Sequence, residues 1–110
     1  MGDRTRNEVL ARWVADHHPG AKVADVAGGQ GLLTLELLAR GLTSTVIDPR
    51  ITDLSADLRR RQRRGELPMV TRRRRLFSAA DAGEFDLVVS ASPRRRTWSG
   101  RTTTATSSTD

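Results

Sequence analysis

A short apolar segment that runs directly into a glycine-rich turn constrains this chain more than any other feature. Residues 23–31 read Val-Ala-Asp-Val-Ala-Gly-Gly-Gln-Gly, and a Leu-rich segment of helical character follows. A parallel strand would deliver Asp25 to its carboxyl end, and glycines lack the Cβ that keeps a bulky ligand away from the backbone. The pattern therefore predicts a strand, a turn and a helix that together form a nucleotide-type site.

Length and composition limit the chain to one small domain. A chain of 110 residues can bury about 60–70% of its unfolded surface, which allows a modest core. It contains no cysteine, so disulfides and thiolate metal sites are excluded. No apolar run reaches the roughly 18 residues of a membrane span, and no apolar signal segment follows the first residues. We therefore expect a cytoplasmic protein with no membrane association.

Hydrophobic periodicity predicts four strands separated by helices. The first helix places Val9, Leu10, Trp13 and Val14 on one side. A parallel connection needs about a dozen residues, which favours residues 69–72 over 74–77 as the third strand. Helices are expected at residues 5–16, 32–40 and 51–64, and strands at residues 22–27, 43–47, 69–72 and 85–91.

Strands that alternate with helices predict an α/β fold with a parallel sheet. We expect residues 1–93 to form a partial, Rossmann-like sheet in the strand order 3-2-1-4 with flanking helices. Nine of the last fourteen residues are Ser or Thr, and such a segment has too little apolar surface to offset the entropy of ordering. Residues 94–110 are therefore predicted to be a disordered tail.

Three nucleotide-binding patterns can be compared with the turn. The P-loop needs Gly-Lys followed by Ser or Thr, and its absence after Gly31 excludes that pattern. The dinucleotide pattern G-x-G-x-x-G matches Gly29 and Gly31 but meets Thr34 in place of the third glycine. The third pattern is an acid followed by alternating small residues, and it resembles motif I of class I S-adenosylmethionine-dependent methyltransferases. Its members here are Asp25, Ala27, Gly29 and Gly31.

The resemblance covers about residues 20–93 and implies a site for S-adenosylmethionine. In that family the turn admits the methionine and ribose parts of the cofactor, and an acid that ends the second strand binds both ribose hydroxyls. Asp48 stands in that place. A carboxylate suits two adjacent hydroxyls because it offers two acceptor oxygens, and the same geometry would serve the ribose of NAD. The implied cofactor-binding residues are Asp25, Ala27, Gly28, Gly29, Gly31, Asp48 and Asp81.

Two roles remain open for Asp81. By resemblance it is the acid that contacts adenine, but Ser78-Ala-Ala-Asp81 also fits a helix capping box. The family pattern weakens at residues 90–93, which lack the Asn or Asp before Pro-Pro used by amino-methylating members. We expect an amino-terminal half of a methyltransferase, truncated or frameshifted near Ser92, with no identifiable catalytic residue and an unknown methyl acceptor.

Positive charge is concentrated between Arg59 and Arg75, a segment that contains nine arginines and a single acidic residue, Glu66. Such a patch can bind RNA through its phosphates, but no aromatic residues for base stacking are interleaved, which favours a solvated face. A non-enzymatic nucleic-acid-binding module and a fragment of an NAD-dependent oxidoreductase remain as alternatives. His17-His18 has no nearby third ligand, so no metal site is predicted.

Overall fold

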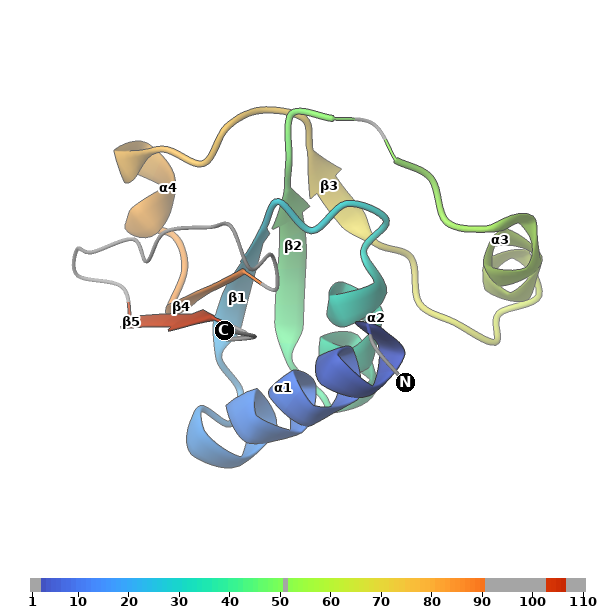
Figure 1. Ribbon diagram of the computed structural model, residues 1–110, viewed down its shortest axis with the longest axis horizontal. Helices are drawn as coiled ribbons and strands as arrows, with labels where there is room; N and C mark the ends of the chain where they lie inside the picture. The colour runs from blue at the N-terminus through green and yellow to red at the C-terminus, as the bar shows by residue number, and fades with distance from the viewer. Residues whose placement is uncertain (1–2, 51, 91–102, 107–110) are drawn as a thin grey trace.

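Five parallel strands form one sheet in the order β3-β2-β1-β4-β5 (Figure 1). The computed structural model describes residues 3–50, 52–90 and 103–106. The predicted α/β fold with strand order 3-2-1-4 is confirmed, and β5 is an addition beside β4. The helices are α1 (Asp3–His17), α2 (Leu32–Ala39), α3 (Ala56–Arg63) and α4 (Ala79–Ala82); the strands are β1 (Lys22–Val26), β2 (Thr43–Ile47), β3 (Thr71–Arg73), β4 (Leu87–Ser90) and β5 (Thr103–Thr106).

The sheet is buried on both faces around β1. On one face α1 and α2 pack over the strands, while the other face carries a second apolar cluster that includes Phe85 and Phe77. The first cluster includes Leu10, Val14, Val23, Leu33, Leu37, Leu87 and Val89, and the second includes Ala24, Val26, Ile47 and Val88. Burial on both faces explains why the strands read as continuous apolar runs.

The buried stripe of α1 differs from the prediction. Leu10 and Val14 are buried as expected, but Val9 and Trp13 are exposed. The reason is the helical turn of about 100° per residue, which places each of the exposed residues a quarter-turn or more from its buried neighbour. Trp13 stacks instead on His17, with 4.5 Å between the ring centroids.

The segment between β2 and β4 contains two corrected boundaries. The helix predicted from residue 51 begins at Ala56, because Ser55 is its N-cap and accepts a hydrogen bond from the Leu58 amide at 3.3 Å. The third strand lies at Thr71–Arg73 rather than residues 69–72, and Met69 is exposed. The alternative at residues 74–77 forms no strand. α3 buries none of its side chains and lies beyond β3, away from the sheet (Figure 1).

Part of the segment that was expected to be a tail, Thr103–Thr106, is a strand in the structure. These residues form β5, which pairs with β4 from Leu87 opposite Thr103 to Ser90 opposite Thr106. Strand pairing uses backbone groups, so a segment whose only apolar side chain is that of Ala105 can still pair with the edge of β4. The other residues of the predicted tail lie outside the described residues. Within the described ranges, no helix is long and apolar enough to cross a membrane.

Candidate functional site

The turn between β1 and α2 requires small residues because of its positive φ angles and, at one position, because of its close neighbours. Gly31 has a φ of 95°, and an added Cβ would lie 3.1 Å from Val70 Cγ1, so both its conformation and its neighbours require glycine. Gly29 has a φ of 57°, but an added Cβ would meet nothing within 4 Å. Ala27 also has a positive φ, 56°, which strains an L-residue by roughly 1 kcal/mol. The backbone at Gly29 therefore borders open space.

Asp25 lies beneath this turn rather than on its surface. Its Oδ2 accepts a hydrogen bond from Thr34 Oγ1 at 2.8 Å, and Ser44 Oγ lies 2.8 Å from the same hydroxyl. Its Oδ1 is buried with no hydrogen-bond partner. A Cβ on Gly28 would lie 2.7 Å from the Asp25 carboxyl carbon, so the turn closes tightly over this side chain. Burial raises the pKa of Asp25 to about 7.

Asp48 connects the end of β2 to the glycine turn. Its Oδ2 accepts a hydrogen bond from the Gly29 amide at 3.1 Å, and its Oδ1 accepts one from the Arg50 amide at 2.9 Å. The carboxylate is buried, and the exposed Arg50 side chain lies beside it with Nε 3.8 Å from Oδ1. Each carboxylate oxygen has two lone pairs, so each can accept one further hydrogen bond.

Arg72 is a site residue that sequence reasoning missed. Its Nη1 donates to the Gly29 carbonyl at 2.8 Å, and its Nη2 donates to the Gln30 carbonyl. The Gly29 amide is thus held by Asp48, which follows β2, and the Gly29 carbonyl is held by Arg72, which lies in β3. Arg72 is separated by 43 residues from Gly29 and belongs to a run of arginines, so its partner becomes visible only once β3 is placed beside β2.

Asp81 has the structural role that its sequence context predicted. Its Oδ2 accepts hydrogen bonds from the Ser78 amide at 2.9 Å and the Ser78 hydroxyl at 3.2 Å, and the capping box is present. Arg75 donates to both carboxylate oxygens, and this pairing lowers the pKa of Asp81 to about 2. Among the residues that the structure describes, no hydrogen bond links Asp81 to the turn or to Asp48. The turn and Asp48 are therefore brought together, and Asp81 is occupied elsewhere.

Most arginines of the predicted basic patch form ion pairs with acidic side chains. Arg60 pairs with an acid on its own helix, and other arginines pair with acids that lie near them in the chain or on the next element. These pairs are Arg60 with Asp57, Arg61 and Arg64 with Glu66, Arg73 with Glu84, and Arg75 with Asp81. Together with Arg72, which is bound to the turn, they leave no continuous run of unengaged guanidinium groups from Arg59 to Arg75.

A scan against models of protein families finds no match, and a search of curated proteins finds none either. In the part of the chain that the structure describes, no three His, Cys, Asp or Glu side chains are grouped so that they could hold a metal ion. The candidate site is therefore the turn, Asp48 and Arg72, with open backbone at Gly29 beside a carboxylate that retains acceptor capacity.

Proposed function

We propose that this chain binds S-adenosylmethionine through the turn after β1 and through Asp48, as the cofactor-binding part of a methyltransferase. The 3.1 Å hydrogen bond between Asp48 and the Gly29 amide carries the proposal. It brings the acid that ends β2 to the glycine turn that ends β1. A nucleoside ligand needs both features, because the sugar lies against backbone without a Cβ and its two hydroxyls need a carboxylate acceptor.

The residues present fit such a ligand in three respects. Open space lies where a side chain at Gly29 would project. Asp48 can accept two further hydrogen bonds once the exposed Arg50 side chain moves aside, and a surface contact of that kind contributes little to stability. Asp25 lies below the turn with an unpartnered Oδ1, and a positive charge on a ligand nearby would stabilise its ionised form.

Within this proposal the described residues bind and orient the ligand. When bound, S-adenosylmethionine supplies an electrophilic methyl group on its sulfonium sulfur. The backbone at Gly29 would receive the methionine and ribose parts, and Arg72 would keep that backbone in place through its carbonyl contacts. We assign no catalytic residue, because displacement at a sulfonium is accelerated chiefly by positioning of the nucleophile.

Calorimetric titration of the full chain with S-adenosylhomocysteine, NAD and a short RNA tests the proposal. We expect saturable binding of S-adenosylhomocysteine. Saturable binding of NAD alone would contradict the proposal in favour of an oxidoreductase fragment, and binding of RNA alone would contradict it in favour of a nucleic-acid-binding module.

Asp48→Asn provides the sharper form of this test. It removes the charge but keeps an oxygen that can accept from the Gly29 amide, so the fold is expected to persist. The affinity for S-adenosylhomocysteine should fall by about tenfold or more, since a hydrogen bond to a charged group contributes roughly 1.5–3 kcal/mol. Asp57→Asn on α3 is the matched control, because Asp57 is exposed and pairs only at the surface with Arg60. Equal affinities of the two variants would refute the role of Asp48.

A further inference from the structure

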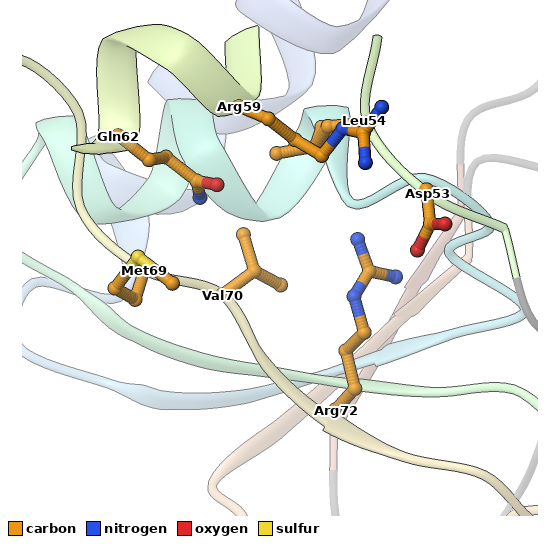
Figure 2. Close-up of a pocket in the computed structure, with 7 residues that line it drawn as sticks. All are labelled: Asp53, Leu54, Arg59, Gln62, Met69, Val70 and Arg72. Carbon is orange, nitrogen blue, oxygen red and sulfur yellow. The ribbon is translucent and has the colours of Figure 1, made fainter. Parts of the chain in front are cut away.

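A hollow of about 110 Å³ lies between α3 and β3 (Figure 2). It exists because α3 is rich in arginine and buries none of its side chains, so the helix does not pack closely on the strands beneath it. None of the lining residues is Asp48 or a glycine of the turn. Arg72 is the one lining residue that the hollow shares with the candidate site, where it holds the turn through the Gly29 and Gln30 carbonyls.

Three charged side chains line one side of this hollow. Figure 2 shows Arg59, Arg72 and Asp53 converging there from α3, β3 and the segment before α3. Arg72 uses two of its five N–H donors on the carbonyls of the turn, which leaves three for a ligand. Within residues 3–50 and 52–90, no acid forms an ion pair with Arg59. Two guanidinium groups and one carboxylate give this side a net charge of +1.

Three apolar side chains and the amide of Gln62, which donates to the Pro68 carbonyl at 2.9 Å, line the rest of the hollow. Met69 lies on the side opposite the charged groups in Figure 2 and Val70 lies nearer the middle, while buried Leu54 also lines the hollow. Met69 is exposed although it is large and apolar. A ligand that covered Met69 would remove apolar surface from water, which is favourable by about 25 cal/mol per Å² in general.

We infer that this hollow binds a small monocarboxylate with a short apolar tail. Arginine suits a carboxylate because its planar donors match two oxygens at once. A single negative charge matches the net charge of Arg59, Arg72 and Asp53, whereas a phosphate dianion would be repelled by Asp53. The tail would lie against Met69 and Val70. The inference does not depend on the proposed function.

Titration of the isotopically labelled full chain with isovalerate, followed by NMR chemical shifts, tests this inference. We expect saturable shifts at Arg59, Met69 and Val70 with a Kd of about 1 mM, because so small a ligand can reach only weak affinity. Isovaleramide has the same shape without the charge, and inorganic phosphate has charge without the tail. The affinity for each of these two probes should be at least about tenfold lower than the affinity for isovalerate. An affinity for either probe equal to that for isovalerate would overturn the inference.

Substitutions in the hollow should act in opposite directions. Arg59→Gln should weaken isovalerate binding by about tenfold, while Arg63→Gln, on the same helix but outside the hollow, should leave it unchanged. Asp53→Asn should strengthen binding by about threefold, because it removes the like charge. Identical behaviour of the two arginine variants, or weaker binding by Asp53→Asn, would contradict the inference.

Discussion

Two buried aspartates in this molecule have opposite acidities. Asp25 is 1% exposed and Asp81 is 2% exposed, but Asp25 lies deep in the protein, whereas Asp81 lies close to the surface beneath the half-exposed Arg75. Burial raises the pKa of Asp25 to about 7, whereas the ion pair with Arg75 lowers the pKa of Asp81 to about 2. The difference comes from the depth of burial and from the partner, since Asp25 is deeply buried beside the Thr34 hydroxyl, whereas Asp81 is paired with a guanidinium group.

This contrast separates a scaffold region from a candidate site. Asp81 is ionised, paired on both oxygens and part of a helix cap, which is the arrangement expected of a group that stabilises the fold. Asp25 lies beneath the glycine turn with one oxygen unpartnered, so its ionised form destabilises the fold. Strongly shifted carboxyl groups of the second kind are concentrated at functional sites in proteins. The carboxyl group beneath the turn therefore has the character of a candidate site, whereas the carboxyl group at α4 stabilises the fold.

The largest expected effect concerns the pH dependence of stability. Folded Asp25 keeps its proton up to about pH 7, whereas the unfolded chain loses it near the ordinary pKa of 3.8. Because the folded state binds the proton more tightly, the free energy of unfolding falls as the pH rises from about 4 to about 7, by about 4 kcal/mol. Asp25→Asn should remove this fall in urea unfolding curves recorded between these pH values. A fall of the same size in the variant would contradict the account, and Asp57→Asn is the control.

A smaller effect is expected from adding a methyl group to a glycine that lies near each aspartate in the sequence. Gly28→Ala places a Cβ 2.7 Å from the Asp25 carboxyl carbon and should lower the free energy of unfolding by about 2 kcal/mol. Gly83→Ala, at the end of α4, places its Cβ in open space at a φ of −73° and should raise stability by about 0.5 kcal/mol. Urea unfolding of both variants measures the difference. Equal changes would show that the turn is not closed over Asp25 as described.

The smallest expected effect is the loss of the Asp81 charge. Asp81→Asn should lower the free energy of unfolding by about 1 kcal/mol at neutral pH, because the half-exposed Arg75 remains solvated and screening reduces the value of the pair. The lowered pKa means that this contribution is complete above about pH 4 and is lost as the pH falls through about 2. Wild type and variant should therefore converge in thermal unfolding at low pH. A difference that grows on acidification would contradict this sign.

The sheet was predictable because its strands are short apolar runs that end at recognisable turns. Strand β2 lies at the predicted residues, and the length needed for a parallel crossover correctly favoured the region of β3 over residues 74–77. Strand β5 was not predictable, because its pairing depends on backbone groups and it lies within residues 97–110, whose Ser- and Thr-rich composition is that of a disordered segment.

The candidate site was predictable only in part. Parallel topology places the ends of β1 and β2 at one edge of the sheet, so Asp48 could be expected near the turn. The Thr34 hydroxyl on Asp25 and the Arg72 contact with the turn could not be expected, since both depend on side-chain reach and on the register of neighbouring elements. The identity of the ligand stays a prediction from the resemblance of the turn to motif I.

Binding of S-adenosylhomocysteine to Gly29→Ala and Gly20→Ala, measured by calorimetry, tests the central claim most directly. The two glycines have φ values of 57° and 74°, and an added Cβ meets nothing within 4 Å at either, so both variants should lose about 1 kcal/mol of stability. Only at Gly29 would the methyl group enter the space proposed for the ligand. We predict that Gly20→Ala binds like the wild type and that Gly29→Ala binds about tenfold more weakly or not at all. Equal affinities of the two variants would contradict the claim that the turn is the ligand site.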